Sequence, residues 1–291
     1  MSRTFVIAEA AATHDGSLEK ALRLIDLARV IRADAVKFQW LSSPERLAQR
    51  RNAPEYLSVY RMLAFPREWF HALVDRCSDE RIEWDGEACV EVPPVEFICT
   101  VFLPEDIAVV APYVKRFKVA SFEAGDAHFL GLHAEFRKQV IVSAGMQDAG
   151  AMRSAVCRYV GLLDVPPPSW SSAIALLHCV SAYPCPDDEI NLGVLRQNVW
   201  NAAAARFSGL SDHTPHPWTG ALAVAAGAEI VELHMRLDDT DPGNADYAVS
   251  RSPAEAREYV ANIRTAEVML GDGVKCVMPC EEPMLKYRVR P

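Results

Sequence analysis

Polar side chains that could do chemistry come at or just after the ends of short apolar runs, and they do so along the whole chain. If those runs are parallel strands of a closed barrel, their carboxyl ends meet at one mouth. We therefore expect a single site assembled from many short segments. The polar residues at these run ends are Glu9, Lys37, Gln39, Thr100, Lys118, Ser121, Glu123, Ser143, Tyr183, Ser211, His213, Glu232 and His234.

Two lysines in this set, Lys37 and Lys118, lie within apolar runs. Burying a lysine is costly unless an anion accompanies it, and nearby hydroxyl groups are donors suited to phosphate oxygens. The sequence thus predicts a cradle for a phosphate or a carboxylate. The alternative stays open that the lysines extend to solvent and that the hydroxyl residues end strands by chance. The hydroxyl groups concerned are those of Thr100, Ser121, Ser143 and Ser211.

His213 and His234 end neighbouring runs, so both imidazoles could reach one metal ion, with water or substrate oxygen at its remaining positions. The alternative is a pair of polar loop histidines bonded to carboxylates. Glu9 and Glu123 are candidates for proton transfer or for binding a hydroxyl group, against the alternative of salt bridges to the two lysines.

The elements that must position these residues alternate between short apolar or β-branched runs and amphipathic segments of helix length. That alternation is typical of βα units around a parallel sheet. Ser17 could cap the first helix, in which Leu18, Leu22 and Ile25 repeat at helical spacing. Eight strands and eight helices predict a single (β/α)8 TIM barrel, an α/β fold. The predicted strands are residues 4–8, 35–39, 96–100, 116–120, 139–143, 174–179, 206–210 and 229–234.

Three segments interrupt this rhythm. Residues 41–66 follow the second strand, where barrel enzymes place substrate loops, so we expect a lid or specificity segment. Residues 84–94 precede the third strand and should lie at the opposite face, as should the prolines at 166–168, which predict a stiff connector. We expect the barrel to span residues 1–271 and a C-terminal tail to span residues 272–291.

Composition excludes several classes of protein. Half of the 291 residues are hydrophobic and the formal net charge is −9, which gives no basic surface for nucleic acid. No apolar run approaches the roughly 20 residues that cross a bilayer, and the N-terminus lacks the pattern of a signal peptide. We expect a cytoplasmic protein with its eight cysteines reduced. Cys276 and Cys280 could form half a zinc site, but a second pair at suitable spacing is missing, which favours two ordinary thiols.

Eight short motifs, taken in order, closely resemble the N-acetylneuraminate (sialic acid) synthase family. The resemblance runs from about residue 5 to residue 288. Each motif is weakly specific alone, and the set is highly specific. The motifs are Ile7-Ala-Glu-Ala, His14-Asp-Gly, Asp34-Ala-Val-Lys-Phe-Gln39, Lys118-Val-Ala-Ser-Phe-Glu123, Ser143-Ala-Gly-Met, Leu177-His-Cys-Val-Ser-Ala-Tyr-Pro184, Ser211-Asp-His-Thr214 and Glu232-Leu-His234.

The resemblance implies condensation of phosphoenolpyruvate with a sugar aldehyde. Carbon C3 of phosphoenolpyruvate attacks the aldehyde carbon, water adds at C2, and phosphate leaves by C–O cleavage to give a 2-keto-3-deoxy acid. It also implies a divalent metal, Mn²⁺ or Mg²⁺, bound by His213 and His234 as a Lewis acid. The residues matching the family's phosphoenolpyruvate contacts are Lys37, Thr100, Lys118, Ser121, Ser143 and Ser211. Those matching its sugar contacts are Glu9, Gln39, Glu123, Tyr183 and Asp246.

Departures from the family pattern fall mainly on the sugar side. Thr13 and Asp15 replace asparagines usual around His14, Ser181 replaces another, and Val101 replaces a proline. The tail ends near the start of the family's linker to a small antifreeze-like domain, so we expect that domain to be absent. For both reasons we expect an aldehyde other than N-acetylmannosamine.

We expect a homodimer. Two other functions remain open: an ulosonic acid synthase that acts on a phosphorylated aldose, and a non-catalytic barrel that binds metal or phosphate and serves as a partner or scaffold.

Overall fold

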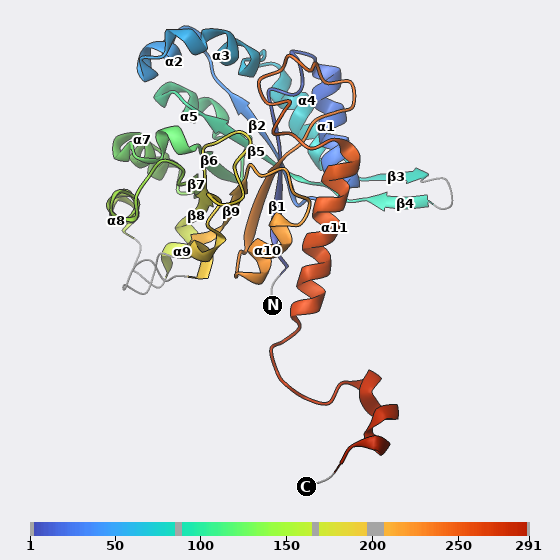
Figure 1. Ribbon diagram of the computed structural model, residues 1–291. Helices are drawn as coiled ribbons and strands as arrows, with labels where there is room; N and C mark the ends of the chain where they lie inside the picture. Colours follow the sequence, from blue (N-terminus) through green and yellow to red (C-terminus); the bar gives the residue numbers. More distant parts are fainter. Residues whose placement is uncertain (1–2, 85–88, 165–168, 197–206, 290–291) are drawn as a thin grey trace.

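The computed structural model describes residues 3–84, 89–164, 169–196 and 207–289. Eight strands close into a barrel in the order β1-β10-β9-β8-β7-β6-β5-β2, and every neighbouring pair is parallel (Figure 1). This is the predicted (β/α)8 barrel. Its strands are β1 (Phe5–Ala11), β2 (Ala35–Trp40), β5 (Glu96–Val101), β6 (Arg116–Val119), β7 (Gln139–Ser143), β8 (Ile174–Cys179), β9 (Phe207–Asp212) and β10 (Ile230–His234).

Helices follow the strands and cover the outside of the barrel (Figure 1). Eight helices were expected, one after each strand, and the connection from β8 to β9 differs from that expectation. Its described part contains the 3-10 helix η4 (Leu192–Arg196), and residues 197–206 lie outside the described residues. The covering helices are α1 (Leu18–Val30), α4 (Trp69–Ser78), α5 (Pro104–Val110), α7 (Ala127–Leu132), η2 (His133–Phe136), α8 (Ala149–Leu163), α9 (Trp170–Ala173), α10 (Thr219–Ala225) and α11 (Pro253–Leu270). The short helix α6 (Ser121–Ala124) follows the carboxyl end of β6.

The first helix forms for the reasons that its sequence suggests. The Ser17 side chain accepts a hydrogen bond from the Lys20 amide at 3.3 Å, which satisfies one of the free donors at the start of α1. Its buried stripe, which includes Leu24 and Ile25, packs against the barrel.

Strand positions agree with the sequence analysis, and the differences fall at strand ends. The bounds of β7 and β8 are those predicted. By contrast, β1 continues to Ala11 and β9 to Asp212, past the predicted ends at residues 8 and 210. Polar residues such as Glu9 and Ser211 break the apolar pattern, while the backbone pairing continues through them.

Inside the barrel, a layer of apolar side chains lies beneath the polar ends of the strands. Successive residues of a strand point to opposite faces, so the residue two places after an inward apolar one also points inward. Ile7 is thus followed by Glu9, Ile98 by Thr100, and Ile230 by Glu232. The apolar layer comprises Ile7, Ala35, Ile98, Ile141, Ala175, Leu177 and Ile230.

The two described excursions lie at opposite ends of the barrel. Residues 41–66 form α2 (Pro44–Arg51), η1 (Pro54–Tyr56) and α3 (Leu57–Leu63) beyond the carboxyl ends of the strands (Figure 1). We call this segment the lid. The second excursion is an antiparallel hairpin of β3 (Arg81–Trp84) and β4 (Cys89–Val92). Arg29 lies at the end of α1 that leads into β2 and donates to the carbonyls of Val92 and Pro93. These bonds hold the base of the hairpin at the amino-terminal face of the barrel. The prolines at 166–168 lie outside the described residues.

After α11 the chain leaves the barrel as an extended arm (Figure 1). Residues 271–289 are exposed throughout, including those of the 3-10 helix η5 (Pro279–Tyr287). Within the described ranges, no helix has both the length and the apolar character that crossing a membrane requires.

Candidate active site

All predicted site residues except one line a single cavity of about 990 Å³ at the carboxyl ends of the strands. The exception is Thr100, which was expected to contact substrate. It is fully buried beneath the cavity, where its hydroxyl accepts a hydrogen bond from Lys37 at 3.4 Å. Thr100 therefore positions a lysine. The lining residues that the sequence predicted are Glu9, Lys37, Gln39, Lys118, Ser121, Glu123, Ser143, Tyr183, Ser211, His213, His234 and Asp246.

The two lysines lie in the floor of this cavity, almost fully buried. Lys37 forms an ion pair with Glu9 on the adjacent strand, with which it is in register. Lys118 donates to the Ser143 hydroxyl at 2.6 Å. The alternative that the lysines extend to solvent is therefore wrong. The salt bridge weighed as the alternative role of Glu9 is present.

A third charged residue joins the lysines, one that the sequence placed at a run end without assigning it a role. Glu232 lies between them, with its carboxylate oxygens 3.8 Å from the Lys37 nitrogen and 3.7 Å from the Lys118 nitrogen. It also accepts a hydrogen bond from Ser211 at 3.0 Å. Glu232 is two residues before His234 on β10, so strand alternation alone could have placed it on the inward face.

The electrostatics of this floor follow from burial. Burial lowers the pKa of Lys37 to about 8, against the attraction of Glu232. For Glu232 the balance is reversed. Burial by itself raises the pKa of its carboxyl group, but the attraction of Lys118 and Lys37 outweighs burial and leaves that pKa below its ordinary value. The carboxylate is therefore charged near neutral pH.

The two histidines lie side by side, with ring centroids 5.2 Å apart. The Nδ1 atom of His213 donates to the Val180 carbonyl at 2.7 Å, so Nε2 is the nitrogen left for another ligand. Among the described residues, the buried Nδ1 of His234 has no hydrogen-bond partner. Burial and the positive charge of His213 hold the pKa of His234 well below its ordinary value, so its imidazole is neutral.

These features fit a divalent ion held by two imidazoles. A neutral ring with an unpartnered buried nitrogen is suited to bind a metal. In the described ranges, no three histidine, cysteine, aspartate or glutamate side chains are grouped so that they could hold a metal ion together. The protein would thus supply two ligands, and water or substrate would supply the rest.

The predicted sugar-side residues lie higher in the same cavity. The Tyr183 ring is 4.2 Å from the His213 ring, centroid to centroid. Asp246 comes from the loop after β10 and accepts a hydrogen bond from the Ala12 amide at 3.1 Å. Glu123, on α6, forms an ion pair with Arg51 of the lid. The sequence identified the lid as a segment but not Arg51, because its partner is 72 residues away in the chain.

Close approach of loops shapes the wall near Ser121. The Gly145 amide donates to the Ser121 hydroxyl at 3.1 Å. A Cβ atom at residue 145 would lie 2.3 Å from the Ser181 hydroxyl and 2.8 Å from that of Ser121. A side chain at residue 145 would therefore require both hydroxyls to move. Ser181 lines the cavity, and its hydroxyl has no hydrogen-bond partner among the described residues.

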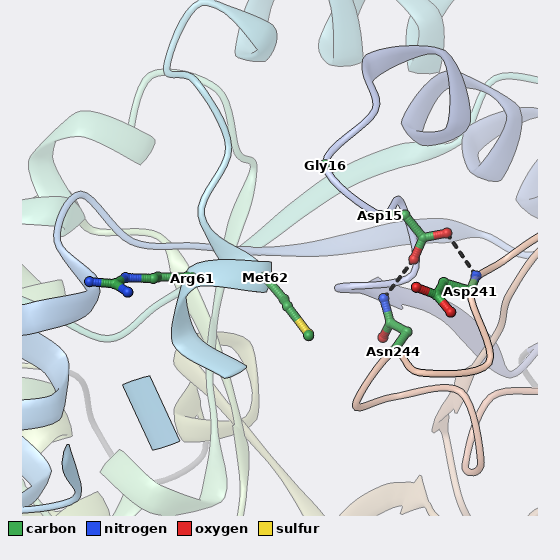
Figure 2. Close-up of a pocket in the computed structure, with 6 residues that line it drawn as sticks. All are labelled: Asp15, Gly16, Arg61, Met62, Asp241 and Asn244. Atoms are coloured by element: carbon green, nitrogen blue, oxygen red, sulfur yellow. Dashed lines mark hydrogen bonds between the residues drawn. The ribbon is translucent and has the colours of Figure 1, made fainter. Parts of the chain in front are cut away.

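A smaller pocket of about 320 Å³ shows what one of the unusual residues, Asp15, does (Figure 2). One oxygen of the Asp15 carboxylate accepts from the Asn244 side chain at 2.8 Å, and the other from the Asp241 amide at 2.9 Å (Figure 2). Asp15 thereby ties the loop after β1 to the loop after β10. Thr13 is buried and donates to the carbonyls of Ala10 and Met235. Neither lines the main cavity, so both would affect sugar binding only through the loops that they join.

The chain is similar to several known proteins. The chain is 32% identical over 286 residues to N,N'-diacetyllegionaminic acid synthase of Legionella pneumophila, covering 93% of this chain and 74% of that protein. It is 30% identical over 290 residues to spore coat polysaccharide biosynthesis protein SpsE of Bacillus subtilis, covering 97% and 72%.

Among solved structures, an N-acetylneuraminic acid (sialic acid) synthetase from Leptospira borgpetersenii superposes with a TM-score of 0.80 at 28% identity. The match covers 99% of this chain and 92% of that one. The family model NeuB matches residues 24–275, which include every barrel strand except β1 and every predicted lining residue except Glu9. The chain belongs to the NeuB family.

Proposed function

We propose that this protein condenses phosphoenolpyruvate with a sugar aldehyde to give a 2-keto-3-deoxy acid and phosphate. The observation that carries the proposal is the single cavity, which joins a floor of buried lysines and hydroxyls to a pair of histidines and a carboxylate-rich upper wall. Relatives named as synthases of legionaminic, pseudaminic and N-acetylneuraminate-9-phosphate products support it.

Phosphoenolpyruvate fits the floor because its charges match the donors there. Lys37, Lys118 and the hydroxyls of Ser121, Ser143 and Ser211 can donate to the phosphate and the carboxylate. Held in this way, the enol carbon C3 would face the upper cavity. Its attack on the aldehyde carbon forms the new C–C bond, water adds at C2, and the C2–O bond breaks as phosphate leaves.

His213 and His234 would hold a divalent ion, which we propose to be Mn²⁺ or Mg²⁺. When bound, it would polarise the aldehyde oxygen as a Lewis acid. The chain's own groups do the rest: Gln39, Tyr183 and Asp246 can bind sugar hydroxyls, and a carboxylate of the upper wall can move a proton to or from the reacting oxygens.

The upper cavity favours an unphosphorylated aldehyde that carries apolar substituents. The lid and the loop after β5 give it an apolar wall that includes Val59, Leu63 and Phe102. A phosphorylated aldose would need a free cation there. Among the described residues that line this wall, the arginines Arg50 and Arg51 are already paired with carboxylates. Methyl groups of acyl or deoxy substituents suit such a wall.

An acceptor panel tests the proposal. Phosphate release and 2-keto acid formation would be measured with phosphoenolpyruvate, Mn²⁺, N-acylated hexoses and phosphorylated aldoses. With ¹⁸O in the bridging position of phosphoenolpyruvate, C–O cleavage places the label in the released phosphate. No turnover with any aldose, or label retained in the organic product, would overturn the mechanism. The highest specificity constant with N-acetylmannosamine would show that the family's usual acceptor is also this protein's.

We also propose a homodimer in the cytoplasm, where phosphoenolpyruvate is made. The dimer is supported by the arm, where side chains such as Val274, Met284, Tyr287 and Val289 are exposed on a segment that leaves the barrel.

A further inference from the structure

Arg51, the last residue of α2, reaches from the lid across the cavity wall to Glu123 on α6. Its Nε and Nη2 atoms both donate to the same carboxylate oxygen, Oε1, at 2.9 and 2.6 Å. A guanidinium paired with a carboxylate in the usual bidentate manner uses both oxygens. Here the two donors converge on one oxygen.

Oε2 of Glu123 therefore accepts no hydrogen bond from Arg51. The Glu123 residue is only 2% exposed, and Oε2 is buried with no hydrogen-bond partner among the described residues. Leaving a charged oxygen in this state is unfavourable unless a ligand completes it. Glu123 lines the cavity, so the group that completes it can come from a molecule bound there.

Aromatic rings from three elements hold the guanidinium in place. Its carbon CZ lies 4.6 Å from the centre of the Phe122 ring on α6, 5.0 Å from that of Phe102 after β5, and 5.4 Å from that of Tyr60 on α3. Planar Arg can stack on these rings and donate in the same plane, which Lys cannot do. The position of Arg51 is therefore fixed before substrate arrives.

We propose that Arg51 is a positioning residue for Glu123: it holds Oε1 so that Oε2 is presented to the reacting oxygens of the aldehyde. The inference rests on the proposed function and deepens it. Because Arg51 belongs to the lid, the Glu123 carboxylate is held in position only when the lid packs against α6.

The charged groups that face Glu123 give this arrangement a measurable signature. Burial raises the pKa of Glu123, Arg51 and Arg50 oppose that rise, and Asp126 adds to it. Removing the positive charge of Arg51 should therefore raise the pKa of Glu123 further. If Glu123 acts as the carboxylate, the acid limb of the rate profile moves to higher pH. If it acts as the acid, the alkaline limb does.

The decisive experiment compares Arg51→Met, Arg51→Lys and Glu123→Gln. We expect Glu123→Gln to lower kcat by about 100-fold or more and Arg51→Met by about tenfold or more, with the KM for phosphoenolpyruvate unchanged. Arg51→Lys should recover part of the loss. The matched control is Arg46→Met, also on α2, whose partner Glu105 is at the surface away from the cavity. It should keep wild-type turnover.

A double-mutant cycle separates positioning from a general effect on the lid. If Arg51 acts through Glu123, then Arg51→Met should change little in the Glu123→Gln background. If instead the losses of kcat in the two single variants multiply in the double variant, the proposal is overturned. The pKa of Glu123 can be measured by ¹³C NMR of its labelled side chain, a readout that needs no turnover. A Glu123 pKa that is the same in Arg51→Met as in the wild type would also overturn the proposal. Absence of condensation by the wild-type protein would instead overturn the proposed function.

Discussion

Lys37 and Lys118 are both buried in the floor of the cavity, where a bound anion can accept hydrogen bonds from them. We predict that Lys37→Met and Lys118→Met each weaken phosphoenolpyruvate binding by at least about 1.5 kcal/mol, roughly tenfold, the low end for a charged hydrogen bond. Calorimetry measures this. The control is Lys115→Met, because Lys115 is exposed and directly precedes β6, the strand that carries Lys118. Unchanged affinity in both variants would mean that the anion binds elsewhere.

Burial lowers the pKa of Lys37 to about 8, which predicts how binding depends on pH. Below that value the lysine is charged and ready for an anion. Above it the lysine is increasingly neutral, and binding must draw a proton from solution. Affinity for phosphoenolpyruvate should therefore fall as pH rises through about 8. Calorimetry in buffers of different ionisation enthalpy should detect proton uptake there, and binding without uptake at pH 8 to 9 would contradict the prediction.

His213 and His234 should matter for turnover more than for folding. Each lies at the carboxyl end of a strand, where substitutions affect chemistry. We predict that His213→Ala or His234→Ala abolishes metal-dependent phosphate release, while the thermal unfolding midpoint stays within a few degrees of wild type. Removing metal with a chelator should stop the wild-type reaction, and Mn²⁺ should restore it. Full activity in either variant would exclude a metal held by this pair.

At the scale of elements, the loops after β1 and β10 act as one unit because Asp15 joins them (Figure 2). Asp15 also forms an ion pair with Lys20 at 2.7 Å. The same loop after β10 carries Asp246. We predict that Asp15→Ala lowers the free energy of unfolding by about 1–3 kcal/mol and raises the KM for the aldehyde, with the KM for phosphoenolpyruvate unchanged.

The milder substitution Asp15→Asn separates the tie from the charge. Residue 15 has φ of +49°, which asparagine tolerates, and its amide oxygen can still accept one of the two loop bonds. Asp15→Asn should therefore retain most of the aldehyde affinity. Equal KM values for wild type and Asp15→Ala would show that the tie does not position Asp246.

At the scale of the whole molecule, the arm is the part of the described chain that the barrel does not cover (Figure 1). If its apolar side chains pack against a second copy, deleting residues 272–291 should convert a dimer into a monomer. Light scattering coupled to size exclusion measures this, and circular dichroism checks that the barrel still folds. A deletion variant that remains a dimer would place the interface on the barrel.

Local sequence patterns determined the barrel and most of the site, because alternation along a strand decides which side chains point inward. The rule that the carboxyl ends of parallel strands meet at one mouth placed Lys37, Lys118, Ser143 and His234 at the cavity from the sequence alone. Alternation also puts Glu232 on the inward face of β10 with His234, but its role between the two lysines was not predicted. The strand ends at Ala11 and Asp212 were missed because backbone pairing, unlike the apolar pattern, continues through polar residues.

Only the tertiary structure decided which polar groups satisfy one another. Thr100 supports Lys37 from below the cavity, Asp15 joins two loops, and Arg51 holds one oxygen of Glu123. The partners of the last two are 229 and 72 residues apart in the chain. Their pairing depends on how loops pack after the barrel has closed. A periodic pattern carries the direction of a side chain, but the identity of its partner exists only once the chain has folded.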